Sequence, residues 1–164
     1  MRAALAPTLR PARDDEAEVV FGIYISTRAE ELAQVPWGQA EKEAFLRMQF
    51  AAQDRYYRET FPDASYDLIV AGSEVVGRLY VDRGADAILV IDLALLPEHR
   101  GRGIGTMLLQ RVLAEAGAEG RPVRIHVEQF NPARRLYERL GFRVIEEQGV
   151  YLLMECLPYP NTAS

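Results

Sequence analysis

The spacing of hydrophobic and polar positions predicts helices in most of the N-terminal third of the chain. A short strand is expected in residues 8–12, followed by a helix over residues 16–32 and a second helix from residue 39 to about residue 60. The stretch "AQVPWGQ" separates the two helices, and "FPDA" ends the second. The apolar residues Val19, Ile23 and Thr27 recur at helical spacing in the first helix, and one side of the second carries Ala44, Met48 and Ala51 or Ala52.

The rest of the chain alternates between strand and helix patterns. Three strands are expected in quick succession, then a helix that ends near Gly117, a strand, a short helix and a final hairpin. The third strand is almost wholly apolar, which is typical of a central strand covered on both faces. This order predicts an α/β fold in which helices cover both faces of a mixed sheet. The expected strands are residues 66–71, 74–81, 87–96, 122–127, 142–147 and 150–156, and the expected helices lie after Gly105 and over residues 131–141.

Three glycines at alternate positions, Gly101, Gly103 and Gly105, stand between the apolar strand and the helix that follows it. The N-terminus of a helix presents unpaired N–H groups and partial positive charge, so a backbone without side chains there suits a phosphate. Arg100 and Arg102 can add full charges. A dinucleotide fingerprint is excluded because Thr106 stands where it needs glycine, and a P-loop is excluded because its lysine is absent. Taken alone, the loop is also compatible with a flexible entry into the helix.

Composition narrows the class of protein. A chain of 164 residues, of which 49% are hydrophobic, is of single-domain size and can bury a core without metal or disulfides. The net charge of -5 argues against nucleic acid as a partner and favours a cationic or amine-bearing one. Cys156, the only cysteine, is expected as a small apolar residue of the last strand and indicates a reducing compartment. Since no signal peptide or membrane span is apparent, we expect a cytoplasmic protein; with two histidines, we expect no metal site.

Two motifs together resemble the central motifs of the GCN5-related N-acetyltransferase (GNAT) superfamily. "RGRGIG" matches the acyl-CoA loop Gln/Arg-x-x-Gly-x-Gly/Ala, and "NPARRLYERLGF" matches the second motif one strand later. The resemblance covers about residues 90–142. It implies one GNAT domain over residues 1–164, with a mostly antiparallel sheet of about seven strands, helices on both faces and a splayed central strand pair. The matched positions are Arg100, Gly103 and Gly105 in the first motif and Asn131, Ala133, Leu136, Tyr137, Gly141 and Phe142 in the second.

The resemblance implies acetyl-CoA, or coenzyme A as product, as the co-substrate. The glycine loop would hold the pyrophosphate, and the pantetheine arm would bond the backbone of Leu93, Ala94 and Leu95 like an added strand. A backbone N–H near Leu95 is the candidate donor to the oxyanion. The full set of expected co-substrate contacts is Leu93, Ala94, Leu95, Arg100, Gly101, Arg102, Gly103, Ile104, Gly105, Thr106, Asn131, Ala133 and Tyr137.

Direct transfer of an acetyl group needs a base for the amine and an acid for the departing thiolate. The resemblance gives the acid role to Tyr137. The base stays open. Some relatives that acetylate protein N-termini have a catalytic glutamate on the strand that precedes Asn131. Counting back from Asn131 puts His126 at the position of that glutamate, whereas counting back from Tyr137 puts Ile125 there. The two counts differ because this chain is one residue shorter than those relatives between Asn131 and Tyr137. Asp92 and Glu128 are the alternatives.

The expected activity is N-acetyl transfer to a primary amine of a small molecule or a peptide N-terminus. In this superfamily the two N-terminal helices and the last hairpin shape the acceptor site, so Trp37 and Tyr56 would either wall an amine slot or pack helix onto sheet. Two alternatives stand beside this function: a non-catalytic acyl-CoA-binding module, and transfer of a different acyl group or to a different acceptor. The resemblance also suggests a homodimer made through the last hairpin.

Overall fold

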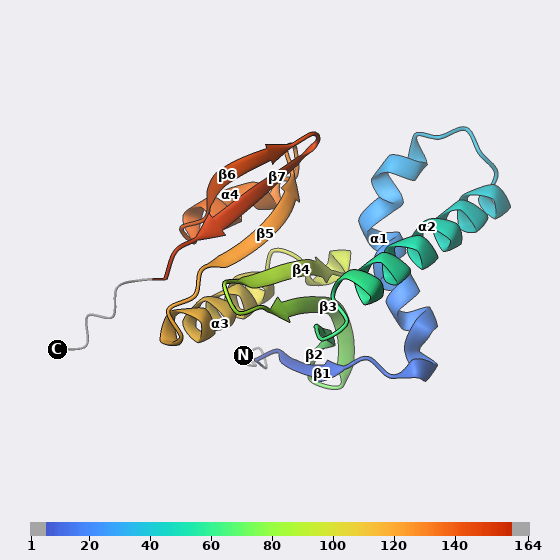
Figure 1. Ribbon diagram of the computed structural model, residues 1–164. Helices are drawn as coiled ribbons and strands as arrows, with labels where there is room; N and C mark the ends of the chain where they lie inside the picture. The colour runs from blue at the N-terminus through green and yellow to red at the C-terminus, as the bar shows by residue number, and fades with distance from the viewer. Residues whose placement is uncertain (1–5, 159–164) are drawn as a thin grey trace. The chain divides into compact units, whose positions relative to one another are not determined.

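The fold is described from a computed structural model, in which residues 6–158 are placed well enough to describe. The predicted order of elements is confirmed, and the second helix begins and ends at its predicted residues (Figure 1). The elements are β1 (Thr8–Pro11), the short 3-10 helix η1 (Asp14–Glu16), α1 (Ala17–Ala33), α2 (Gln39–Thr60), β2 (Ser65–Ala71), β3 (Glu74–Arg83), β4 (Ile88–Leu95), η2 (Pro97–His99), α3 (Ile104–Ala118), β5 (Val123–Glu128), α4 (Ala133–Arg139), β6 (Arg143–Gln148) and β7 (Tyr151–Cys156).

The strands form a seven-stranded sheet in the order β1-β2-β3-β4-β5-β7-β6. β4 and β5 are parallel and pair from Ile88 with Val123 to Val90 with Ile125. The pairs β1–β2, β5–β7 and β6–β7 are antiparallel. Parallel neighbours need a long crossover, and α3 supplies it. The predicted α/β fold with a mixed, mostly antiparallel sheet is therefore confirmed.

Contacts along the described chain divide it into two compact units. The first holds residues up to 79 together with residues 93–100, and the second holds residues 80–92 together with those from 101 onward. Each unit is described by itself below. The expectation of a single domain stays a prediction.

The core of the first unit is built on α1. Val20 and Ile23 pack with Leu68 of β2, and Phe21 and Tyr24 pack with Leu46 of α2. Helix α1 thus buries two sides, one against strand residues and one against α2. Of the apolar residues that recur at helical spacing, Ile23 is buried, whereas Val19 is 43% exposed and Met48 is 59% exposed. Thr27, Ala44, Ala51 and Ala52 are exposed too, because the larger side chains beside them fill the interface.

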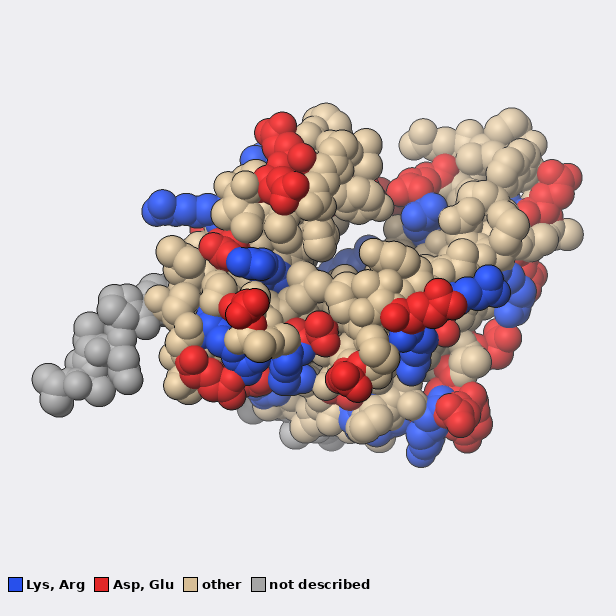
Figure 2. Space-filling model, viewed as in Figure 1, with Lys and Arg blue, Asp and Glu red and all other residues tan. Residues whose placement is uncertain are grey.

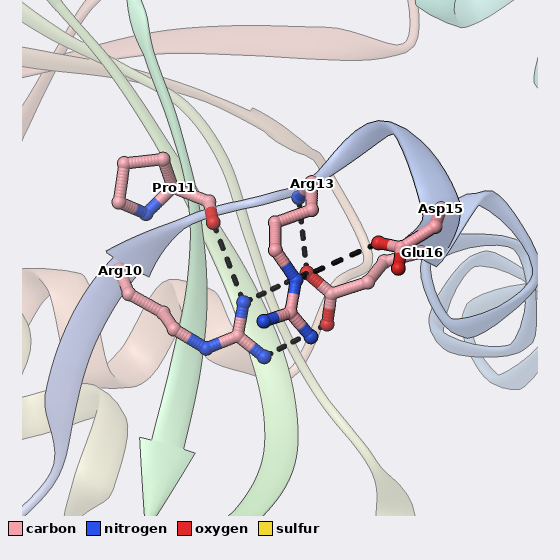
Figure 3. A network of polar contacts seen from close by, with 5 residues as sticks. All are labelled: Arg10, Pro11, Arg13, Asp15 and Glu16. Atoms are coloured by element: carbon pink, nitrogen blue, oxygen red, sulfur yellow. Dashed lines mark hydrogen bonds and ion pairs between the residues drawn. The ribbon is translucent and has the colours of Figure 1, made fainter.

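A carboxylate fixes the junction between β1 and α1 (Figure 3). Arg10 donates hydrogen bonds to both carboxylate oxygens of Glu16, at 2.7 and 2.8 Å, and the backbone N–H of Arg13 donates a third at 2.9 Å. These bonds, that of Arg10 above all, favour the ionised form and lower the pKa of Glu16 to about 2. The charged pair ties the end of the first strand to the start of the first helix.

The second unit presents two unlike faces of β5 and β7. We call the first the buried face, since each of its six side chains is at most 4% exposed. The thiol of Cys156 on this face contacts the Leu140 carbonyl at 3.7 Å, so the end of α4 lies against it. The other side, which we call the open face, carries residues that are exposed or half-buried, most of them polar or charged. The buried face comprises Val123, Ile125, Val127, Leu152, Met154 and Cys156, and the open face comprises Arg124, His126, Glu128, Tyr151, Leu153 and Glu155.

Candidate functional site

The glycine loop adopts the backbone conformation that its sequence requires. Gly101 has φ +73° and Gly103 has φ +83°, in the left-handed region that side chains disfavour. Gly103 is the N-cap residue of α3, and its carbonyl accepts the Met107 N–H at 3.0 Å. Gly105 already belongs to the first turn of the helix. Two of the three glycines are therefore needed for the turn into α3.

The backbone in front of α3 is open to a ligand. A Cβ added at Gly101 or Gly103 would meet no atom within 4 Å, and Arg102 between them is exposed. The first N–H groups of a helix lack partners within it and carry partial positive charge. Ile104, Gly105 and Thr106 contribute these groups to α3. The start of α3 therefore offers backbone N–H groups of the kind that suit an anion.

Arg100 makes contacts that the sequence did not reveal. Its Nε donates to the Leu95 carbonyl at 2.8 Å, and its Nη2 donates to the Ser26 carbonyl at 3.4 Å. Leu95 ends β4 and Ser26 lies in α1, so this guanidinium fastens the strand to the helix. Ala94, beside Leu95, is 8% exposed.

The second motif forms the turn into α4. The Asn131 side-chain oxygen accepts the Ala133 N–H at 2.9 Å, as a residue that caps a helix does. One turn further on, Tyr137 is 7% exposed and its ring lies 5.9 Å from that of Phe142. Both residues are therefore held firmly, Asn131 by its bond to the backbone and Tyr137 by packing.

Tyr137 and Asp92 interact electrostatically. Burial and, to a smaller extent, the negative charge of Asp92 together raise the pKa of Tyr137 from 10.0 to about 12. Asp92 lies two residues after Val90, whose parallel partner Ile125 is on the buried face, so the strand alternation directs Asp92 to that face too. The structure therefore brings together two of the three predicted catalytic residues.

His126 lies on the other side of the sheet. It follows Ile125, pairs with Leu153 of β7 and is exposed on the open face, as is Glu128. The structure thus separates His126 from the Tyr137 and Asp92 pair.

Between residues 6 and 158, no group of three or more His, Cys, Asp or Glu side chains is placed to hold a metal ion. In the same range, no helix combines the length and apolar character that a membrane crossing needs.

Trp37 is 41% exposed, and its ring packs edge-on against that of Phe45; Tyr56 is 60% exposed. A cleft of about 490 Å³ lies between α1 and α2, and Lys42 lines it.

Charges of both signs are mixed over the face drawn in Figure 2. Such a surface differs from the basic stripe by which proteins commonly bind a phosphate backbone.

Comparisons with known proteins agree with these motifs. The profile of the acetyltransferase (GNAT) domain matches residues 64–144. The ribosomal protein bS18 alanine N-acetyltransferase of Haemophilus influenzae is 25% identical over 84 residues, which are 51% of this chain and 58% of that protein. A mycothiol acetyltransferase of Corynebacterium glutamicum is 31% identical over 134 residues, 73% of this chain and 44% of that protein. The chain thus spans about half the length of these two relatives.

Solved structures share the fold along nearly the whole chain. The PaiA N-acetyltransferase of Thermoplasma acidophilum, solved in complex with coenzyme A, has a TM-score of 0.71 and 18% identity over 93% of this chain and 99% of its own. An acetyltransferase of Thermus thermophilus has a TM-score of 0.69 and 24% identity over 94% of this chain and 98% of its own. Through residues 64–144, the chain belongs to the acetyltransferase (GNAT) family.

Proposed function

We propose that this protein is an acetyl-CoA-dependent N-acetyltransferase that moves an acetyl group directly to a primary amine of a small molecule or a peptide. The observation that carries the proposal is the open glycine loop, with Gly101 and Gly103 left-handed in front of the first N–H groups of α3. The coenzyme A complex of the Thermoplasma relative supports this choice of co-substrate. The relatives that act on a ribosomal protein alanine and on mycothiol support acetyl transfer.

The loop backbone would bind the pyrophosphate of acetyl-CoA. The N–H groups at the start of α3 suit two phosphates because they are fixed by the helix and need no reorganisation. Arg102, which is exposed between the two left-handed glycines, would add charge. The backbone of Leu93, Ala94 and Leu95 would bond the pantetheine arm, and one N–H there would receive the thioester oxygen as it becomes anionic.

Tyr137 would serve the departing thiolate. With a pKa of about 12, its phenol keeps its proton throughout the neutral range. It therefore remains a hydrogen-bond donor wherever the enzyme works. Asp92, whose charge acts on Tyr137, is better suited to keeping that proton in place than to taking one from the amine.

The base would act from the opposite side of β5. His126 and Glu128 are exposed on the open face, where an amine has access from solvent. Histidine is the side chain that most often acts as a general base in enzymes, so His126 is the preferred base. The acid and the base would then lie on different sides of β5.

The same proposal includes a cytoplasmic location and a homodimer. Support for the dimer is that β6 stands at the edge of the sheet with all six residues exposed. Sedimentation at micromolar concentration tests it: a sedimentation coefficient that stays at the monomer value would remove the dimer from the proposal.

Calorimetry with acetyl-CoA tests the co-substrate site. Gly103→Glu places a side chain and a negative charge in the loop, and we expect it to abolish binding. Gln110→Glu adds the same charge at an exposed position further along α3, so it should leave binding close to that of the wild type. Loss of binding in both variants would mean that net charge, and not the loop, decides the result. Thiol release over a panel of amines and peptides then separates an enzyme from a non-catalytic acyl-CoA-binding module.

A further inference from the structure

Gly77 stands where β3 and β4 approach each other most closely. A Cβ built on Gly77 would lie 2.2 Å from the carbonyl oxygen of Ala94 and 3.1 Å from the Cα of Leu95. Both are backbone atoms, which cannot move aside as the end of a flexible side chain can. Any residue other than glycine would therefore push the end of β4 away from β3.

Two hydrogen bonds hold the same piece of β4. The Leu96 N–H donates to the Val76 carbonyl at 2.8 Å, next to Gly77. The Leu95 carbonyl accepts from Arg100, whose guanidinium also reaches α1 at Ser26. Successive carbonyls of a strand point to opposite sides, so Gly77 accommodates that of Ala94 while Arg100 takes that of Leu95. The strand end is thus fixed from both sides.

We propose that Gly77 and Arg100 are positioning residues that hold the backbone of Leu93, Ala94 and Leu95 where it can bond acetyl-CoA. This inference rests on the proposed function, in which those backbone groups receive the pantetheine arm. Bonds to backbone cannot be tuned by changing side chains, so the position of the strand decides whether they form. The role of Arg100 then differs from the phosphate contact that the motif suggested: it acts through the Leu95 carbonyl.

Steady-state kinetics of Gly77→Ala test the first residue. We expect the KM for acetyl-CoA to rise roughly ten- to hundredfold, because displacements near 1 Å cost about that much, while the KM for the amine stays within about twofold. The matched control is Gly22→Ala, at a helix glycine of the same unit where a Cβ would meet no atom within 4 Å, and its kinetics should equal those of the wild type. A Gly77→Ala protein that melts earlier but keeps its KM for acetyl-CoA would show a structural role only and overturn the inference.

Variants of Arg100 provide an independent test should Gly77→Ala fail to fold. Lysine keeps the positive charge but lacks the fork that donates to two carbonyls. We expect Arg100→Lys to weaken acetyl-CoA binding as much as Arg100→Met does. Binding that lysine preserves would mean that Arg100 acts by its charge on phosphate, and the positioning role would fall. A wild type that binds no acetyl-CoA would overturn the proposed function and this inference together, whereas the variant results bear on the inference alone.

Discussion

The interaction of Asp92 with Tyr137 predicts a measurable change when the charge of Asp92 is removed. The pKa of Tyr137 is about 12, two units above 10.0, with burial as the larger cause and Asp92 as the smaller. Two units correspond to about 2.7 kcal/mol against ionisation of the phenol. Because Asp92 is the smaller cause, Asp92→Asn should lower the pKa by less than about one unit, or about 1.4 kcal/mol. Tyr137 should still hold its proton up to about pH 11.

Two assays follow this prediction. An ultraviolet titration of tyrosinate, recorded as the difference between wild type and Tyr137→Phe, isolates one tyrosine among the eight in the chain. The same difference measured in an Asp92→Asn background gives the shift. In parallel, thiol release between pH 6 and pH 10 should show no fall in kcat that belongs to Tyr137, while Tyr137→Phe should lower kcat roughly 10²- to 10⁴-fold at every pH.

Three results would contradict these roles of Tyr137 and Asp92. Ionisation of Tyr137 near pH 10 in the wild type would mean that burial does not act as described. A decrease of more than about one unit in Asp92→Asn would make the carboxylate the dominant cause. A Tyr137→Phe enzyme with unchanged kcat would remove the phenol from the acid role, whatever its pKa.

The remaining predictions concern stability. The lowered pKa of Glu16 stabilises the fold above about pH 4.5, and this stability is lost as the pH falls toward about 2. In Glu16→Gln, the free energy of unfolding in urea should therefore fall less steeply between these pH values than in the wild type. An equally steep fall would contradict the contact with Arg10. Leu109→Ala, at a fully buried position, should lower the unfolding free energy by about 2–5 kcal/mol, and Met107→Ala, 39% exposed, by clearly less; equal losses would contradict the burial of α3. Gly22→Ala should raise the midpoint of thermal unfolding, because glycine destabilises a helix by up to about 1 kcal/mol relative to alanine. A lower midpoint would contradict the open space for a Cβ at this position.

The helices and strands of this fold could be predicted because each buries one side, and the spacing of hydrophobic residues along the sequence reflects that side. The helix at Gln39–Thr60 is bounded by Gly38 and by the Phe61–Pro62 break, and both lie in the sequence itself. Which side is buried was harder to predict. Helix α1 has two neighbours. Phe21 and Tyr24 pack against α2, and this contact depends on tertiary packing that no local sequence pattern encodes.

The candidate site divides in the same way. Gly101 and Gly103 signalled a left-handed turn because glycine is the residue that such a turn favours. Gly77 carried no such signal, since its reason is the Ala94 carbonyl opposite, and only the pairing of β3 with β4 brings the two together. Arg100 was noticed for its charge, but its bond to the Leu95 carbonyl depends on how the chain turns after β4.

The structure also bears on the two counts that led to different candidates for the base. Neighbouring residues of a strand face opposite ways, so the count from Asn131 gives exposed His126 and the count from Tyr137 gives Ile125, which is 3% exposed on the buried face. The register of β5 is set by its pairing with β7, in which Ile125 opposes Met154, and not by the helix that follows. The Asn131 side chain accepts the Ala133 N–H just before α4 begins, so a count back from Asn131 crosses no helix residue, whereas a count back from Tyr137 crosses the first turn of α4. The count from Asn131 therefore stays closer to the strand, and His126 remains the predicted base, exposed on the open face.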